Sequence, residues 1–278
     1  MKISLNDKER KINTSISIIV PVHNEELRVS KGINRICEYL DEWEYEYEIL
    51  VAEDGSVDDT VSIVQNLQKD NDRIRLISSK NRLGKGGAIT NAMFFAQKNN
   101  IAYMDVDLAA DPSELERLLN EINDYDIAIG SRLLRGSLPP IKRPFYRTVF
   151  SFFYSRFFGI LFHNPIVDPQ CGFKLFRKEI VQELFRDITT TGFAFDSEVI
   201  VKAYSLGFRI VEVPIIWSHE KASKLRVSQQ MKEMGKDLLR IWYESHVLWL
   251  DKQKVYPQKK GSRLGMLLFW ILKKIYEK

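Results

Sequence analysis

The chain has 278 residues, enough for one large domain, and its 45% hydrophobic and 28% charged residues are typical of a globular protein and exclude a disordered or fibrous one. Its formal net charge of +4 is modest, and we expect no nucleic-acid partner. Two cysteines exclude a disulfide framework and favour a reducing compartment. The polar N-terminus and the lack of any apolar run near the roughly 20 residues of a membrane span predict a cytoplasmic protein, soluble or peripheral on a membrane.

Short apolar segments alternate with helix-like intervals through the first half of the chain. The apolar segments are 15–24, 45–56, 73–79, 101–108 and 125–132, and the intervals are 25–41, 57–70, 85–98 and 112–123. Near-continuous apolar strands that alternate with amphipathic helices indicate a parallel sheet covered on both faces. The sequence therefore predicts an α/β fold with a mostly parallel central sheet.

Polar side chains gather where three of these expected strands end. They are His23, Asn24 and Glu25 after the first, Glu53 and Asp54 after the second, and Asp105 and Asp107 at the fourth. In parallel sheets ligands bind at the carboxyl ends of the strands, so these residues are candidates for one binding site. A solvated rim of charge is the alternative.

Asp105 and Asp107 lie two residues apart at the end of an apolar segment. On an extended strand both side chains point to one side, and two carboxylates so close raise one pKa unless a positive charge lies between them. Mg²⁺ or Mn²⁺, shared with substrate phosphates, is the usual solution, and it neutralises charge on a departing diphosphate. Asp111 directly precedes Pro112, and we favour helix capping over metal binding for it.

Two common nucleotide-binding motifs are absent. A dinucleotide fold needs G-x-G-x-x-G after its first strand, where "IIVPVHNEE" has no glycine, and a Walker loop needs Ser or Thr after its Lys, where Gly86 follows Lys85. Residues 82–88 can still present backbone N–H groups and a helix start to a phosphate. A plain turn before a helix is the alternative.

The alternation stops between residues 141 and 163. This segment has no acidic residue, is rich in Phe and Tyr, and carries four basic residues: Lys142, Arg143, Arg147 and Arg156. Arg147 and Ser151 are four residues apart and share a helix face, and an arginine suits phosphate recognition. We expect this insert in the headgroup region of a membrane; an ordinary core helix is the alternative.

The remaining pattern predicts helices near 178–187, 195–206 and 228–250 and a strand over 208–217. From residue 221 onward the chain carries fourteen Lys or Arg and five Asp or Glu, a local net charge of +9. Such a basic end suits an anionic membrane surface or another polyanion. We expect a main domain over 1–226 and a basic helical extension over 227–278 that contacts a membrane or a partner; packing of its end on the domain is the alternative.

Seven motifs follow one another in the order and spacing of a known family. They are "SIIVPVHNEE", "VAEDGSVDDT", "NRLGKGGAI", "MDVDLAADP", "IGSR", "DPQCGFKLF" and "FAFDSEVI". Over about residues 15–226 the chain resembles the inverting family 2 glycosyltransferases, and within them the polyprenyl- and dolichyl-phosphate hexose synthases, particularly the dolichyl-phosphate β-glucosyltransferase and mannosyl synthase branch. Jointly the motifs are highly specific.

The resemblance implies a GT-A fold with a Rossmann-like sheet, a nucleotide-sugar donor and Mg²⁺ or Mn²⁺. It assigns to the donor Pro21, His23, Glu25, Asp54, Lys85 and Asp105, and to the metal Asp105 and Asp107. Glu53 stands where the family has the first Asp of its D-D-G-S motif, and Ala109 where some members have a Gln as a third metal ligand. The metal would then depend on two Asp, the diphosphate and water.

The resemblance also implies an acceptor side. It assigns to the acceptor phosphate Arg132, Arg147, Ser151 and Lys224, the last in a basic loop that approaches the diphosphate, and it makes Asp107, Asp168 and Asp196 the candidate catalytic residues. Asp168 and Asp196 would orient or deprotonate the acceptor. A loop cap for Asp168, a helix N-cap for Asp196 and a solvated basic turn around Lys224 are the alternatives.

The expected function is inverting transfer of a hexose to a dolichyl or polyprenyl phosphate by an enzyme peripheral on the cytoplasmic face of a membrane. UDP-glucose is favoured as donor and GDP-mannose is the other candidate. Two further hypotheses stay open: a family 2 glycosyltransferase with a lipid-linked or other glycan acceptor, and a non-catalytic nucleotide-sugar-binding protein.

Overall fold

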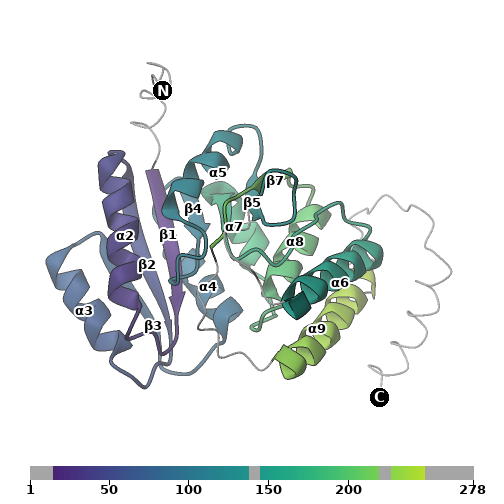
Figure 1. The fold of residues 1–278 in the computed structure, drawn as a ribbon, viewed down its shortest axis with the longest axis horizontal. Helices are drawn as coiled ribbons and strands as arrows, with labels where there is room; N and C mark the ends of the chain where they lie inside the picture. The colour runs from purple at the N-terminus through teal and green to yellow at the C-terminus, as the bar shows by residue number, and fades with distance from the viewer. Residues whose placement is uncertain (1–14, 138–144, 219–226, 248–278) are drawn as a thin grey trace.

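A seven-stranded sheet forms the centre of the protein (Figure 1). The computed structural model describes residues 15–137, 145–218 and 227–247. The strands are β1 (Ser15–Val22), β2 (Glu46–Asp54), β3 (Ile74–Ser79), β4 (Asn100–Tyr103), β5 (Ile127–Ser131), β6 (Lys174–Arg177) and β7 (Ile210–Pro214). Their order in the sheet is β3-β2-β1-β4-β6-β5-β7.

Helices flank this sheet in the alternating order that the sequence predicts. They are α2 (Val29–Glu42), α3 (Thr60–Asp70), α4 (Lys85–Met93), α5 (Leu115–Glu121), α6 (Phe145–Phe162), α7 (Lys178–Phe185), α8 (Phe195–Ser205) and α9 (Val227–Val247), with a 3₁₀ turn, η1 (Pro112–Glu114), before α5. Nearly every residue of β1 and β2 is buried, on both alternating faces, so both faces of the sheet are covered. The predicted α/β class is confirmed.

The strand order reverses between β1 and β4. From β1 the sheet grows one way through β2 and β3, and the other way through β4, and all of these pairs are parallel. Such a switch point is where the loops after two neighbouring strands diverge, which opens space for a ligand at their carboxyl ends.

Strand β6 was not predicted. It runs antiparallel between β4 and β5, with Lys174 opposite both Tyr103 and Ile129. The strand has only four residues and follows a turn, so it lacks the length that marks a strand in a sequence.

The expected strand over 101–108 is wrong in its second half. Strand β4 ends at Tyr103, and Val106 and Asp107 form a turn that continues to Leu108, whose φ is +53°. Asp105 and Asp107 therefore do not lie on one extended strand, and strand geometry does not place their side chains on one side.

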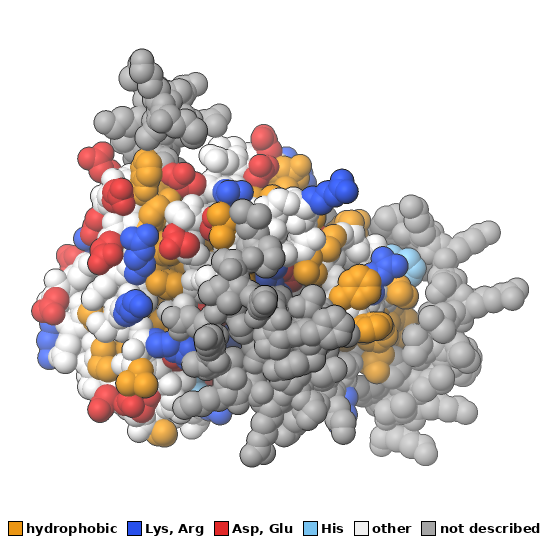
Figure 2. Space-filling model, in the orientation of Figure 1, with side chains coloured by type: hydrophobic (Ala, Val, Ile, Leu, Met, Phe, Trp, Pro, Cys, Tyr) orange, Lys and Arg blue, Asp and Glu red, His pale blue; other side chains and the backbone are white. Residues whose placement is uncertain are grey.

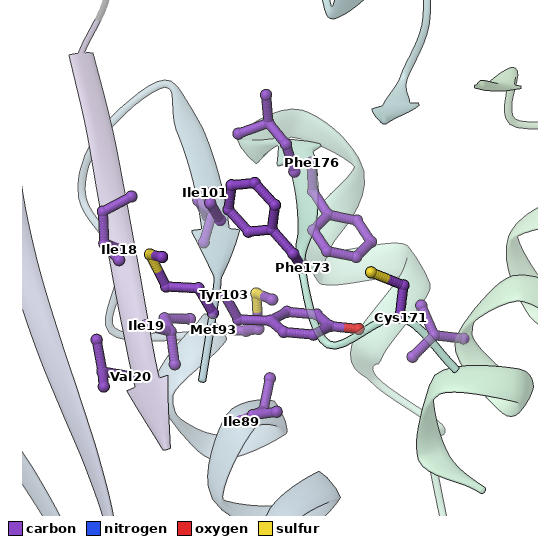
Figure 3. Close-up of a cluster of buried hydrophobic side chains, with 14 of the residues drawn as sticks. Ile18, Ile19, Val20, Ile89, Met93, Ile101, Tyr103, Cys171, Phe173 and Phe176 are labelled. Atoms are coloured by element: carbon purple, nitrogen blue, oxygen red, sulfur yellow. The ribbon is translucent and has the colours of Figure 1, made fainter. Parts of the chain in front are cut away.

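The core beneath the switch point joins β1, β4, β6 and α4 (Figure 3). Ile18, Ile101 and Tyr103 are fully buried, and Ile89 of α4 is buried with them. Burial of one large apolar side chain contributes about 1.5–3 kcal/mol, so this cluster holds the ends of β1 and β4 in place.

Helices α6 and α9 pack together at the end of the molecule opposite α2 and α3 (Figure 1). Hydrophobic side chains gather over α6, whereas acidic side chains are spread around α2 and α3 (Figure 2). Within the described residues, no helix is both long enough and apolar enough to cross a membrane.

We predict that two phenylalanines respond oppositely to truncation. Phe176 of β6 is fully buried, and Phe176→Ala should lower the free energy of unfolding by about 3–5 kcal/mol because it leaves a cavity. Phe153 of α6 is 65% exposed, so Phe153→Ala should change it by less than about 1 kcal/mol. Urea denaturation of both variants measures this, and equal losses would contradict the core described here.

Candidate active site

The switch point carries an ion pair between α4 and the segment after β4. Lys85 is the first residue of α4, and its Nζ lies 2.6 Å from Oδ1 of Asp105. Burial alone would lower the pKa of Lys85, but the carboxylates of Asp105, Asp196 and Asp107 outweigh it and raise the pKa. Lys85 is therefore a fixed positive charge at the switch point.

Asp54, at the end of β2, holds the backbone that leads into α4. Its Oδ1 accepts hydrogen bonds from the N–H groups of Leu83, at 2.5 Å, and Gly84, at 3.1 Å. Gly84 has φ of +79°, a conformation that favours glycine, and directly precedes Lys85. The predicted donor residues Asp54, Lys85 and Asp105 are thus brought together by one short segment.

The turns after β1 and β2 are joined by hydrogen bonds. The ring Nδ1 of His23 donates to the carbonyl of Asp54 at 2.8 Å, and Oδ1 of Asn24 accepts from the N–H of Val57 at 2.9 Å. The N–H of Glu25 donates to Oγ1 of Thr60 at 2.8 Å. The structure therefore places His23 beside Asp54 and Glu25 beside Thr60, with Pro21 near the end of β1; their contact with a nucleoside stays a prediction.

Glu53 and Asp111 have structural partners. Glu53 accepts hydrogen bonds from the N–H of Ser56 and from the hydroxyl of Ser78, so it ties its own turn to β3. Asp111 accepts from the N–H of Ser113 at 2.9 Å and caps η1. The predicted capping role of Asp111 is confirmed.

Asp107 adds a second carboxylate beside Asp105. Burial raises the pKa of Asp107, and the charge of Asp105 raises it further. The charges of Lys85 and Arg28 offset part of this effect on the pKa of Asp107. Carboxylate oxygens are ligands that Mg²⁺ and Mn²⁺ accept. Ala109 has no side chain that could bind a metal, and its backbone N–H donates to Oδ1 of Asp107 at 3.1 Å.

The described part of the chain has no group of three or more His, Cys, Asp or Glu side chains that could hold a metal ion. A divalent ion held by Asp105 and Asp107 would need its remaining ligands from a diphosphate and water, and the role of the two carboxylates as metal ligands stays a prediction.

A buried ion pair fixes the segment before β6. Asp168 accepts from Nε and Nη2 of Arg132, both at 2.7 Å, and from the N–H of Arg132 at 2.9 Å. Burial would raise the pKa of Asp168, but the Arg132 charge and hydrogen bonds lower it. The Arg132 guanidinium also lies 5.1 Å from the ring centre of Trp217. Its predicted role at an acceptor phosphate stays a prediction, and here the guanidinium binds Asp168.

The segment after β7 supports the turn that carries Asp107. Trp217 forms an isolated antiparallel bridge with Ala110, and the N–H of Ser218 donates to the carbonyl of Ala109 at 2.6 Å. The Arg132 side and the Asp107 side of the site are thus connected through Trp217.

Lys174 is a site residue that sequence reasoning missed. It is fully buried, and its Nζ donates to the carbonyl of Cys171 at 2.6 Å, to that of Pro169 at 3.2 Å, and to Oδ1 of Asp196. The hydroxyl of Tyr103 donates to the same Asp196 oxygen at 2.5 Å. A lysine inside the apolar run "GFKLF" is the only signal that the sequence offers.

Asp196 does not cap a helix. The N-cap of α8 is Ala194, and Asp196 lies in the first helical turn, so the alternative of a helix N-cap for Asp196 is wrong. Its carboxylate is instead held by Lys174 and Tyr103, its charge helps to raise the pKa of Lys85, and its catalytic role stays a prediction.

Gly172 brings the segment of Asp168 against the central ion pair. A Cβ atom at this position would lie 2.6 Å from Oδ2 of Asp105 and 3.2 Å from Nζ of Lys85. Only a glycine fits there without displacing the pair. The structure thus gathers Asp54, Lys85, Asp105, Asp107, Asp168 and Asp196 around the switch point.

The remaining acceptor candidates are less completely described. Arg147 lies on α6, as predicted, but its side chain is outside the described residues, and so is the whole of Lys224. Ser151 is half-buried on the same helix.

Comparison with known proteins extends these findings. The profile of glycosyl transferase family 2 matches residues 17–185, more than half of the chain. Glycosyltransferase AglD of Haloferax volcanii is 33% identical over 233 residues, which are 82% of this chain but 37% of AglD, so the chain spans well under half of that relative. Dolichyl-phosphate β-glucosyltransferases of Dictyostelium discoideum and Homo sapiens are each 32% identical over 82% and 81% of this chain and 74% of their own.

Solved structures share the fold. Glucosyl-3-phosphoglycerate synthase from Mycobacterium tuberculosis, in complex with Mn²⁺, UDP and phosphoglyceric acid, has a TM-score of 0.66 and 16% identity over 87% of this chain and 84% of its own. Its complex with UDP has a TM-score of 0.65 and 15% identity over 87% and 85%. At this identity the likeness concerns the fold, which is the GT-A fold expected from the sequence.

We predict that Asp168 makes the free energy of unfolding depend on pH in the acidic range. Because its folded pKa is lowered, its contribution is fully present above the unfolded value near 3.9 and is lost as the pH falls through the folded pKa. Asp168→Asn also leaves Arg132 buried without its counter-ion, so it should cost about 3–5 kcal/mol at pH 7 and less below about pH 4.

Urea denaturation of Asp168→Asn and the parent at pH 7 and between about pH 3 and 5 measures this difference. Asp126→Asn is the control, because Asp126 pairs with an exposed Arg209 and its loss should cost about 1 kcal/mol or less. A gap between Asp168→Asn and the parent that does not change with pH would contradict the prediction.

Proposed function

The chain belongs to glycosyl transferase family 2, and from this premise we propose that it transfers a hexose, with inversion, from a nucleotide-diphosphate sugar to a dolichyl or polyprenyl phosphate. UDP-glucose is the proposed donor because dolichyl-phosphate β-glucosyltransferases are among the relatives that share three quarters of their length with this chain. Only 37% of AglD is covered, so its whole activity carries less weight. GDP-mannose is the donor to test against UDP-glucose.

The observation that carries the proposal is the cluster of Lys85, Asp105 and Asp107 at the β1–β4 switch point. Asp105 and Asp107 would hold one divalent ion, Mg²⁺ or Mn²⁺, which when bound neutralises charge on the leaving diphosphate. Lys85, the first residue of α4, adds a positive charge beside the two carboxylates. Together these residues favour departure of a diphosphate.

A phosphate acceptor needs little help from a base, since it is already ionised at neutral pH. Asp196 accepts from Lys174 and Tyr103, and Asp168 is held by Arg132, so both carboxylates have strong donors already. We assign them to orienting the acceptor side of the site. Arg132, Arg147, Ser151 and Lys224 remain the proposed ligands of the acceptor phosphate.

Helix α6 supports contact with a membrane surface. Four large apolar side chains of this helix are exposed, Phe152, Phe153, Phe157 and Ile160, whereas Tyr154, Phe158 and Leu161 are buried. The helix thus has one face packed on the protein and another apolar face open, and Arg156 is exposed on the same helix. Hydrophobic side chains are visible over α6 in Figure 2. This arrangement suits an interfacial helix, and we place the enzyme on the cytoplasmic face of a membrane.

We predict that the purified protein, with Mn²⁺ and a polyprenyl phosphate, moves label from UDP-[¹⁴C]glucose into the organic phase. Asp107→Asn should lower this transfer on the order of 100-fold, because one of the two carboxylates at the diphosphate is lost. GDP-mannose serves as the competing donor. Label that enters a glycan acceptor but never the organic phase would refute the lipid acceptor, and transfer that is indifferent to Asp107→Asn would refute the site.

We also predict that α6 determines membrane binding. Phe153→Glu together with Phe157→Glu should lower the fraction that floats with liposomes of anionic lipid by about tenfold or more, because two partly exposed rings lose their burial in the interface. Phe95→Glu is the matched control, since Phe95 is 47% exposed but lies after α4. Equal flotation of all three proteins would exclude α6 as the contact.

A further inference from the structure

The segment Thr189–Thr191 lies directly against the first turn of α4. The N–H of Gly86 donates to the carbonyl of Thr191 at 2.8 Å, and a Cβ atom at Gly84 would lie 2.5 Å from the same oxygen. Gly84 and Gly86 flank Lys85 in the sequence. The backbone around Lys85 therefore rests on one carbonyl of this segment, with no side chain between them.

Side chains of two helices, α8 and α9, bind the same segment. Glu198 of α8 accepts from the N–H of Thr189 at 3.0 Å and of Thr190 at 2.6 Å. Arg240 of α9 donates from Nη1 to the hydroxyl of Thr189 and from Nη2 to that of Thr190, both at 2.7 Å. A planar guanidinium that spans two adjacent hydroxyls fixes the segment in orientation as well as position.

The contact between Thr189–Thr191 and the first turn of α4 is too close for a displacement of one to leave the other in place. A Cβ atom at Gly86 would lie 2.7 Å from the carbonyl of Thr190 and 2.5 Å from the Cβ of Phe195, the first residue of α8. Close-packed interiors transmit small displacements rather than damping them. A movement of Thr189–Thr191 must therefore move the turn that carries Lys85.

We propose that Arg240 is a positioning residue for Lys85. Through the hydroxyls of Thr189 and Thr190 it holds the segment against α4, and so keeps Nζ of Lys85 at the Asp105 carboxylate. The inference rests on the proposed function, in which this pair faces the donor diphosphate. It also makes α9 part of the catalytic unit, although the sequence had suggested a separate extension over 227–278.

A purely structural Arg240 would hold α9 to the domain and do nothing more. It also donates to Glu244 on its own helix, at 3.2 Å, and lies 3.9 Å from Asp237. The two roles differ in one measurable way. Positioning predicts that loss of Arg240 matters only while Lys85 is present, whereas a structural role predicts independent effects.

A double-mutant cycle on UDP affinity tests this, with calorimetry at saturating Mn²⁺. Arg240→Gln should weaken UDP binding by about fivefold or more, and Lys85→Met should weaken it further. The double variant should bind no more weakly than Lys85→Met alone. Thr189→Val with Thr190→Val keeps the shape of the segment and removes both acceptors, so it should reproduce the effect of Arg240→Gln.

Arg177→Gln is the matched control. Arg177 also binds two acceptors of one loop, the carbonyls of Ile122 and Asn123, but at the opposite end of β4 from the site. Its loss should leave UDP affinity unchanged.

Additive losses in the cycle, or an Arg240→Gln protein that melts earlier and binds UDP normally, would overturn the inference while leaving the proposed function intact. A parent protein that binds Mn²⁺ and UDP not at all would instead overturn the proposed function, and the inference with it.

Discussion

The ion pair between Lys85 and Asp105 is the interaction on which the rest of the site depends. Asp105 and Asp107 are close, partly buried and mutually repulsive, so the end of β4 tolerates them only beside a positive charge. Neighbouring residues stabilise the Lys85–Asp105 pair. Asp54 fixes the turn before Lys85, and Gly172 gives the pair room by having no side chain. One electrostatic requirement thus explains why segments from four parts of the chain converge on the β1–β4 switch point.

The parallel part of the fold could be predicted because its signals are local. Continuous burial of β1 and β2 makes long apolar runs, and amphipathic helices separate them, so element type and order follow from the sequence. The strand β6 and the end of β4 at Tyr103 could not be predicted in this way. β6 forms because it pairs with both β4 and β5. That pairing is tertiary, and a segment of four residues carries no sequence signal for it.

Some features of the candidate site could likewise be predicted from the sequence, and others could not. The location of Asp54, Asp105 and Asp107 at the strand ends could be predicted because they follow apolar runs, and the cap at Asp111 because Pro112 stands beside it. The partners of Asp168 and Asp196 were not found. Asp168 pairs with an arginine 36 residues away, and Asp196 pairs with Lys174, 22 residues away. The sequence suggested only a catalytic role or a local cap for each of them. Pairing at such distances decides which carboxylates are available for chemistry.

The position of β6 has a consequence for how the chain acquires its structure. β4 pairs with β1 on one edge, but its other edge is satisfied only by residues 174–177, some 70 positions later along the chain. Contacts of that separation close late and slow folding, because the intervening loop must first be ordered. During synthesis on the ribosome, the edge of β4 that pairs with β6 would stay unpaired until β6 emerges. The partly formed sheet would then be most exposed to aggregation and to binding by chaperones.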